Sequence, residues 1–246
     1  MLIAIFTDVH ANRQAFGACL AQARDYGAQQ FVLLGDLVGY GADPDWVVTI
    51  VMELVDKGAV AILGNHDNAV GDLREKLNVE AQAAMEWTRG ELSREQRKFL
   101  KSLPMTIKDD DRLYVHAEAS DPKGWHYVAS ADDAARSMMA TEAQITFCGH
   151  IHLPAIYSMS ATAKMTGFVP VSGVKMQLLP SRRWIAVLGS VGQPRDGNPA
   201  ACFAMLDTER RELTYCRAPY DVEEAAKRIR KKGLPTWLAD RLLLGE

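Results

Sequence analysis

The sequence contains few cysteines, and these are far apart along the chain. Cys19, Cys148, Cys202 and Cys216 include no C-x-x-C pair. Such spacing indicates neither a disulfide framework nor a zinc site made of cysteines. We therefore expect reduced thiols in the core.

Long apolar runs and an excess of charge of one sign are also absent. No window approaches the roughly 18 uninterrupted apolar residues of a membrane-spanning helix. The first residues, MLIAIFTDVHAN, have no basic region, and their apolar run is too short for a secretory signal. The net charge of −3 gives no general attraction for nucleic acid. These features predict a soluble cytoplasmic protein with no membrane partner, and they disfavour a nucleic-acid partner.

The first part of the chain alternates between apolar runs and helical patterns. Helices are expected at 12–26 and after Asp43 and Pro44, which suit the start of a helix. This alternation predicts βαβ units and a mainly parallel sheet. The expected strands are 2–6, 30–35, 59–64, 112–117 and 145–150.

The remaining segments have other sequence patterns, and no repeat or long linker separates them from the first part of the chain. After residue 152, short β-like runs predict a second, antiparallel-leaning sheet, and residues 221–244 are expected to form helices. Residues 72–101 are charged and helix-forming, and we expect them to form a helical cap over a site. The whole chain, 1–246, is long enough and apolar enough for one domain. The candidate buried positions of the cap are Leu77, Ala81, Ala84, Met85 and Leu92.

Polar side chains follow each expected strand of the first part. The carboxyl ends of strands in an open α/β sheet form the ligand crevice, so residues far apart in sequence can meet there. Of the six histidines, only His126 lies outside these positions. The residues concerned are Asp8, His10, Asp36, Asn65, His66, Asp67, His116, His150 and His152.

Each of these motifs alone has an ordinary structural explanation, and only their combination indicates chemistry. Carboxylate, imidazole and amide oxygen together suit Mn²⁺, Fe²⁺, Ni²⁺ or Zn²⁺. The groups are too many for one ion. Two ions about 3.5–4 Å apart need a bridging carboxylate, and such a pair can hold both reacting oxygens of an in-line phosphoryl displacement. Asp36, in a tight turn after Gly35, is the best candidate bridge.

The motifs resemble, in order and spacing, the signature of the calcineurin-like metallophosphoesterases. The segment GSVGQPRDGNPA, residues 189–200, is similar to one in the small bacterial phosphoesterases of that superfamily. The resemblance implies a four-layer α/β/β/α sandwich of two mixed sheets flanked by helices. The motifs are Asp8-x-His10, Gly35-Asp36, Gly64-Asn65-His66-Asp67, His116 and Gly149-His150-Ile151-His152.

The resemblance also implies a role for each motif residue. His66 would supply a proton or a positive charge near the leaving oxygen, and the Asp67 carboxylate would hold it. The nucleophile would be a hydroxide that bridges two divalent ions, because metal binding lowers the pKa of water towards 7. One ion would be held by Asp8, His10 and His152, the other by Asn65, His116 and His150, and Asp36 would bridge both.

Further residues are candidate substrate contacts. An arginine is well suited to a bidentate phosphate contact, although an arginine in a polar loop is also commonly only solvated. Glu118 follows the ligand His116, where many small relatives have HGSP, and it either adds an acid close to the metals or points to solvent. The candidate contacts are Asn12, Arg13, Tyr40, Gln193 and Arg195.

Three functions remain open at this stage. The leading one is a two-metal hydrolase of phosphate monoesters or diesters, acting on a small nucleotide-like molecule or a phosphoprotein. The second is a non-catalytic metal-binding scaffold of the same fold, which the intact His66-Asp67 pair disfavours. The third is a nuclease, which the acidic composition disfavours.

Overall fold

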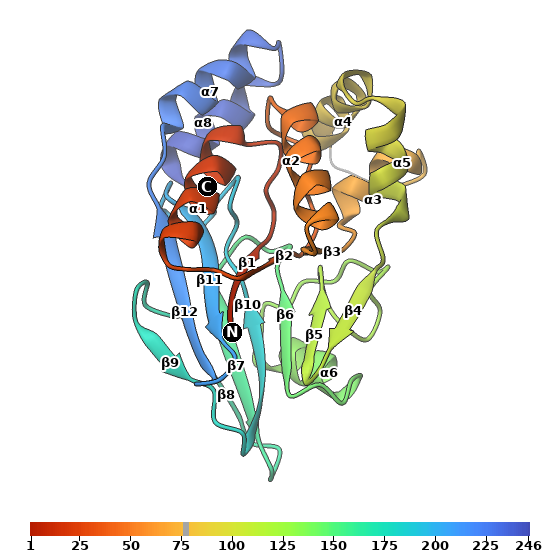
Figure 1. Cartoon of the computed structure of the whole chain (residues 1–246). Coiled ribbons are helices and arrows are strands. Elements are labelled where there is room, and N and C mark those ends of the chain that lie inside the picture. Colours follow the sequence, from red (N-terminus) through yellow and green to blue (C-terminus); the bar gives the residue numbers. More distant parts are fainter. Residues whose placement is uncertain (76–78) are drawn as a thin grey trace.

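The computed structural model describes residues 1–75 and 79–246 and contains two six-stranded mixed sheets with helices on their outer sides (Figure 1). An apolar layer joins the two sheets, with Ile5 and Val32 of the first sheet in the same buried cluster as Phe147 and Ile156 of the second. The predicted α/β/β/α sandwich is confirmed. Within the described residues, no helix is both long and apolar enough to cross a membrane.

The first sheet combines the N-terminal strands with strands from the end of the chain. β1, β2 and β3 are parallel, and β11 pairs antiparallel with β1, for example Ile3 with Leu206. In spatial order the strands are β3 (Val60–Ala61), β2 (Gln30–Leu33), β1 (Leu2–Phe6), β11 (Ala201–Asp207), β12 (Glu212–Ala218) and β9 (Lys175–Gln177).

The second sheet is built around two parallel strand pairs. β6 lies between β5 and β10 and is parallel to both, whereas β7 runs antiparallel to β10. In spatial order the strands are β4 (Thr106–Asp109), β5 (Arg112–Val115), β6 (Ile145–Cys148), β10 (Arg182–Val187), β7 (Ala155–Ser160) and β8 (Met165–Phe168).

The predicted division into an early parallel sheet and a late antiparallel sheet is wrong. All five expected early strands exist, but β5 and β6 belong to the second sheet, and the late strands are shared between both sheets. The reason is that β11 returns to pair with β1, while β10 pairs with β6. The five early strands therefore contribute to two sheets that lie face to face.

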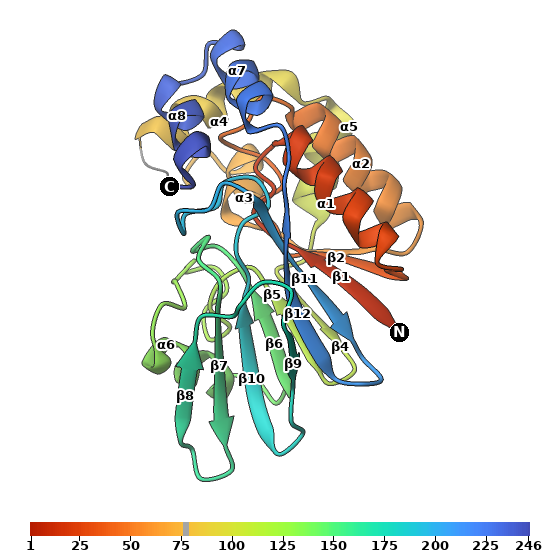
Figure 2. The same ribbon diagram turned by 90° about the vertical axis from the view of Figure 1, so that its left-hand side faces the viewer.

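Helices cover the outer faces of both sheets (Figure 2). α1 (Arg13–Asp25) packs on β11 and β12, and α6 (Ala131–Met139) packs on β7, β8 and β10. Asn12 caps α1, because its Oδ1 accepts a hydrogen bond from the Ala15 amide at 3.1 Å. Asp43 precedes α2 (Pro44–Asp56), but its carboxylate binds Arg228 instead of the helix amides.

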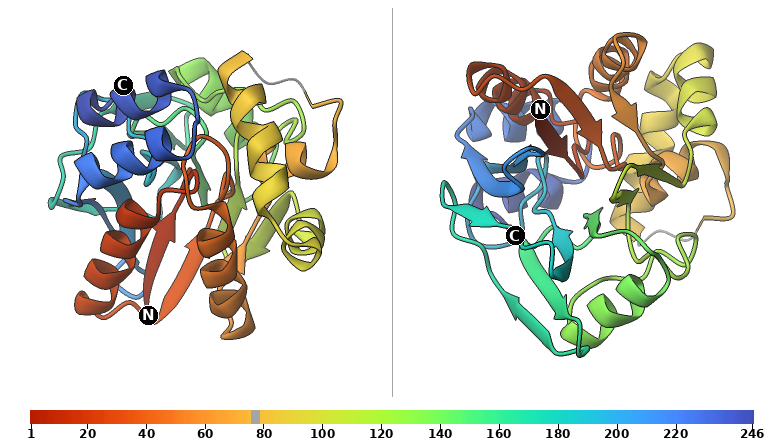
Figure 3. Two further views of the ribbon diagram at one scale, coloured as in Figure 1. Left: turned by 90° about the horizontal axis from the view of Figure 1, so that it is seen from above. Right: turned by 60° about the horizontal axis from the view of Figure 1, so that its bottom comes forward.

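The C-terminal helices lie beside α1, as the view from above shows (Figure 3). α7 (Val222–Lys231) and α8 (Thr236–Leu244) pack against each other and share a buried cluster with Ala81 and Ala84 of α4 (Val79–Glu91). α3 (Asn65–Gly71) and α5 (Arg94–Ser102) complete this side of the molecule. Of the expected buried positions in 72–101, Ala81, Ala84, Met85 and Leu92 are buried, and Leu77 lies outside the described residues.

Candidate metal centre

The predicted ligands follow β1, β2, β3, β5 and β6 and meet where the carboxyl ends of these strands come together. Several of them have a left-handed backbone, which is unfavourable for residues with a side chain and is typical of functional sites. These residues are Asp8 (φ 53°), His10 (φ 47°), Asp36 (φ 51°), His150 (φ 70°) and His152 (φ 64°).

Two glycines allow the turns to approach each other at this point. A Cβ atom on Gly149 would lie 2.1 Å from Thr7 Oγ1, and one on Gly64 would lie 2.2 Å from the Asp36 amide nitrogen. Both distances are far below van der Waals contact. Glycine is therefore required beside Asp8 and Asp36 for steric reasons.

The first group of possible ligands consists of Asp8, His10 and His152, all fully or almost fully buried. His152 Nε2 lies 3.2 Å from Asp8 Oδ1 and 3.1 Å from His10 Nε2. The Nδ1 atoms of the two histidines donate to backbone carbonyls, of Val38 for His10 and of Gln193 for His152. This leaves the lone pairs of both Nε2 atoms directed into the group.

The second group consists of Asp36, His116 and His150. His116 Nε2 lies 3.4 Å from Asp36 Oδ2 and 3.1 Å from His150 Nδ1. His116 Nδ1 donates to the Leu34 carbonyl at 2.7 Å. Its Nε2 atom is again the one that faces the neighbouring ligands.

Asp36 lies between the two groups. Its Oδ1 accepts a hydrogen bond from the His66 amide at 2.8 Å, which fixes the carboxylate. Its Oδ2 lies 3.4 Å from His116 Nε2 in one group and 3.8 Å from His10 Nε2 in the other. One oxygen atom is thus close to both groups, as expected for a bridging ligand.

The donor atoms fit divalent cations. His10 Nε2 and His152 Nε2 are 3.1 Å apart, and since both rings are protonated at Nδ1, no hydrogen lies between them in the neutral state. Two facing lone pairs repel unless a cation lies close by. Asp8 Oδ1 and Asn65 Oδ1 are buried without a hydrogen-bond partner, which is costly in the absence of a cation. This set of imidazole, carboxylate and amide donors matches borderline divalent metals.

Charges within the centre shift the pKa values of its histidines in different directions. Burial opposes protonation of His116, but the carboxylates of Asp36 and Asp8 outweigh it and raise the pKa to about 9. Burial and the charge of His116 lower the pKa of His150 to about 3. Burial also lowers the pKa of His10 and of His152. Of these four histidines, His116 is therefore the one whose pKa is shifted towards the protonated form in the metal-free protein.

His66 lies beside these groups, but it is not held by Asp67 as the resemblance implies. Asp67 Oδ1 accepts hydrogen bonds from the Leu37 and Val38 amides at 2.9 and 3.2 Å, and Oδ2 accepts one from the Gly64 amide. These backbone amides occupy the carboxylate, so Asp67 fixes the turns around the centre rather than the imidazole. Burial and the nearby Asp36 charge raise the pKa of Asp67 to about 8.

The His66 ring is buried, and its Nδ1 has no hydrogen-bond partner. Burial lowers its pKa, although the charge of Asp36 opposes this effect. The ring lies 4.9 Å from that of His10 and 4.5 Å from that of Tyr40. With His10 and Asp36 it forms a third group that is geometrically able to bind a metal.

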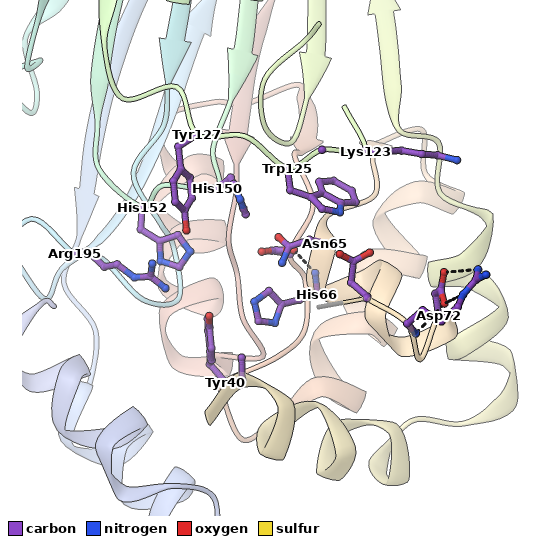
Figure 4. Close-up of a pocket in the computed structure, with 15 residues that line it drawn as sticks. Tyr40, Asn65, His66, Asp72, Lys123, Trp125, Tyr127, His150, His152 and Arg195 are labelled. Atoms are coloured by element: carbon purple, nitrogen blue, oxygen red, sulfur yellow. Dashed lines mark hydrogen bonds and ion pairs between the residues drawn. The ribbon is translucent and has the colours of Figure 1, made fainter. Parts of the chain in front are cut away.

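A cavity of about 840 Å³ opens directly over the centre (Figure 4). Its floor includes Asp36, Asn65, His66, His150 and His152. Its walls come from separate parts of the chain: Tyr40 and Arg195, residues 72, 74 and 75 before α4, Ala81 of α4, and Lys123, Gly124, Trp125 and Tyr127 of the loop between β5 and α6.

Comparison with known proteins identifies the family. The family model of the calcineurin-like phosphoesterase superfamily domain matches residues 1–211. The chain belongs to this superfamily. The phosphoesterase is also similar to an uncharacterized protein of Methanocaldococcus jannaschii, with 31% identity over 99% of this chain and 98% of the relative.

Solved structures agree with this assignment. The crystal structure of a metallophosphoesterase from Sphaerobacter thermophilus is 34% identical, covers 100% of this chain and 99% of that chain, and superposes with a TM-score of 0.88. A hypothetical protein from Pyrococcus horikoshii OT3, 18% identical with a TM-score of 0.80, shares the fold over 100% of this chain and 98% of that chain.

Two of the candidate substrate contacts of the phosphoesterase face the cavity. Tyr40 and Arg195 line it, and the Arg195 guanidinium lies 6.0 Å from the centroid of the Tyr40 ring. Arg195 Nη2 donates to Gln193 Oε1 at 2.9 Å, while its buried Nε has no hydrogen-bond partner. Arg195 is therefore fixed at one end and retains a free donor.

The other three candidates do not line this cavity. Asn12 caps α1 and donates to the Gly192 carbonyl, so its side chain serves the fold. Arg13 is exposed and lies 5.0 Å from the Trp46 ring. Gln193 is buried and supports His152 through its carbonyl and Arg195 through its side chain. Their contact with a substrate stays a prediction, whereas the structure shows the contacts that they make within the chain.

The sequence analysis did not predict that aromatic residues line the cavity, and it did not predict that Glu118 is buried. Trp125 and Tyr127 line the cavity, whereas the side chain of His126 between them is exposed and does not line it. The signal available was two aromatic residues at alternate positions shortly after the ligand His116. Glu118 is fully buried, and the Ser120 amide donates to its carboxylate at 3.0 Å, so of the two alternatives given for it the one in which it points to solvent is wrong.

Proposed function

We propose that the chain is a dinuclear phosphoesterase that hydrolyses phosphate monoesters or diesters of small molecules. The observation that carries this proposal is the position of Asp36 Oδ2 between two groups of buried donor atoms. In the proposed assignment, Asp36 would contribute to both positions of a pair of divalent ions of Mn, Fe, Ni or Zn. The other ligands would be Asp8, His10 and His152 for one ion and Asn65, His116 and His150 for the other.

Metal ions bound there would polarise the phosphoryl oxygens and lower the pKa of water towards 7. Residues of the chain would bind the phosphoryl group and supply a proton to the leaving oxygen. Arg195, whose charged side chain lines the cavity, would bind a phosphoryl oxygen by a charge-assisted hydrogen bond. His66 lies on the cavity floor and, in its protonated form, would donate a proton to the leaving oxygen. The cap function of residues 72–101 stays a prediction, supported by the position of Ala81 in the cavity wall.

The experiment that tests this proposal combines metal analysis with hydrolysis. After reconstitution with Mn²⁺ and removal of free metal, we expect elemental analysis to give close to two ions per chain. The reconstituted protein is expected to hydrolyse bis(p-nitrophenyl) phosphate or p-nitrophenyl phosphate, and a chelator should abolish the reaction. Saturation at one ion per chain would rule out the bridged pair. Two ions without any hydrolysis would favour the non-catalytic scaffold.

Metal affinity is expected to rise with pH. The pKa of His116 is raised to about 9 in the metal-free protein, so below that pH a metal ion must displace a proton from this ring. Each unit of pH below 9 should then weaken binding by about tenfold through this one proton. Calorimetric titration with Mn²⁺ at pH 6.5, 7.5 and 8.5, in buffers of different ionisation enthalpy, measures both the affinity and the protons released.

The control for the pH dependence is His126→Ala, which removes an exposed histidine outside the centre. This variant should retain the pH dependence and the proton release of the parent protein. An affinity that does not change between pH 6.5 and 8.5 would contradict the assignment of a protonated His116 in the metal-free centre.

A further inference from the structure

The loop between β5 and α6 presents two aromatic rings at the metal centre (Figure 4). The Tyr127 ring lies 4.6 Å from the His150 ring at an interplanar angle of 33°, and the Trp125 ring lies 5.8 Å from the His116 ring. Both side chains line the cavity, and half of the Tyr127 side chain is exposed. The two rings therefore lie beside the Asp36, His116 and His150 group with accessible surface.

The loop is held in shape by contacts outside the metal groups. The buried Glu118 carboxylate accepts a hydrogen bond from the Ser120 amide, and the Ala119 amide donates to Ser137 Oγ of α6 at 3.1 Å. Trp125 has a left-handed backbone with φ of 50°, which is rare for a bulky residue. Such a conformation persists only where surrounding contacts enforce it, and it is concentrated at ligand sites.

The space in front of these rings is too large for a phosphate group alone. A cavity of about 840 Å³ is of the size that encloses a complete small organic ligand. An exposed aromatic face beside a cationic group favours a ligand that combines a flat π system with phosphate, and stacking on tryptophan or tyrosine is the usual way to hold a nucleobase. Arg195 supplies the cationic group on the same cavity.

Acidic groups of the cavity favour a nucleoside over a phosphorylated peptide. Asp72 and Glu75 line the cavity, where Asp72 is paired with Arg74 and Glu75 accepts a hydrogen bond from Asn68. The remaining lone pairs of these carboxylates can accept hydrogen bonds from ribose hydroxyls or base amino groups. We propose that Trp125 and Tyr127 bind the base of a nucleotide whose phosphate lies at the metal centre. This inference rests on the proposed function and selects nucleotides from the phosphate esters that it covers.

The experiment compares two ligands that differ only in the base. Binding of adenosine 5′-monophosphate and of ribose 5-phosphate is measured by calorimetry. Both ligands are phosphate monoesters, so the measurement uses metal-reconstituted His66→Ala protein, which is expected to hold its metal and to hydrolyse them slowly. This variant serves as the parent protein of the comparison. We expect adenosine 5′-monophosphate to bind at least about 10-fold more tightly. Trp125→Ala and Tyr127→Ala should each weaken it by about 10-fold to 100-fold, because base stacking is lost. Affinity for ribose 5-phosphate should change less than about threefold.

Two variants separate stacking from structural damage. Trp125→Phe keeps an aromatic face and should retain most of the preference for adenosine 5′-monophosphate. Tyr26→Ala removes another tyrosine that is half exposed, 51% against 50% for Tyr127, and it does not line the cavity. It should leave both affinities unchanged. The midpoint of thermal unfolding, measured for every variant, identifies any that are not folded.

Three outcomes would overturn the inference. Equal affinity of the parent protein for the two ligands would exclude a binding site for the base. An unchanged preference for adenosine 5′-monophosphate in both alanine variants would exclude it as well. Tighter binding of a phosphotyrosyl peptide, with the same dependence on Trp125 and Tyr127, would assign the site to phosphotyrosyl proteins instead of nucleotides. Failure of the proposed function has a different signature, namely no hydrolysis of the nitrophenyl esters by protein that still prefers adenosine 5′-monophosphate.

Discussion

Asp36→Asn is expected to deplete both metal positions together and to reduce phosphoesterase activity by about three orders of magnitude or more. The reason is that one oxygen of Asp36 lies close to both donor groups, so its charge would contribute to the binding of an ion at either group. Loss of metal removes several kcal/mol of charge stabilisation in the transition state, and each 1.36 kcal/mol is about tenfold in rate. Elemental analysis and hydrolysis of bis(p-nitrophenyl) phosphate measure the two effects.

The matched control for this variant is Asp43→Asn. Asp43 is also a buried aspartate, but its carboxylate is paired with Arg228 and belongs to none of the three groups of possible metal ligands. This variant should bind two ions per chain even if it unfolds at a lower temperature. The bridging role of Asp36 would be refuted if Asp36→Asn lost one ion and bound the other with parental affinity.

His66→Ala is expected to lower kcat by about 10²–10⁴ while metal content stays at the parental level. His66 is assigned to proton transfer to the leaving oxygen, so the loss should be large for esters of alcohols, which are poor leaving groups. It should be small for nitrophenyl esters, whose leaving group departs without a proton. Steady-state kinetics with one ester of each kind, together with elemental analysis, measures this difference.

The same measurements on a control variant test the assignment of His66 to proton donation. His126→Ala removes an exposed histidine and should leave kcat unchanged for both esters. A loss of metal in His66→Ala would instead make His66 a ligand in the group that it forms with His10 and Asp36. An equal loss for good and poor leaving groups, with chemistry rate-limiting, would exclude proton donation.

The clustering of the candidate ligands could be predicted from the sequence because each of them follows a local strand pattern. Asp8 and His10 follow an apolar run that forms β1 over the expected residues, and His150 and His152 follow β6 in the same way. The sheet to which each strand belongs could not be predicted, because it depends on β10 and β11, which pair with strands distant in sequence. Local periodicity carries no information about such partners.

The residues around the ligands were harder to predict for a related reason. Asp67 follows His66 directly, yet its carboxylate binds the Leu37 and Val38 amides of another turn. Trp125 and Tyr127 lie in a loop, where no helical or strand period indicates the direction of a side chain. Contacts of these kinds are determined by how separate turns pack against each other. They become visible only in the folded chain.

The left-handed turns that carry Asp8, His10, Asp36, His150 and His152 also set a limit on how this protein can evolve. Each such residue costs about 1–3 kcal/mol relative to a relaxed backbone. Glycine would relieve the backbone at every one of them but would remove the donor atom. Selection for thermal stability alone would therefore act against the metal centre, and the rest of the fold must supply the surplus stability that allows the centre to persist.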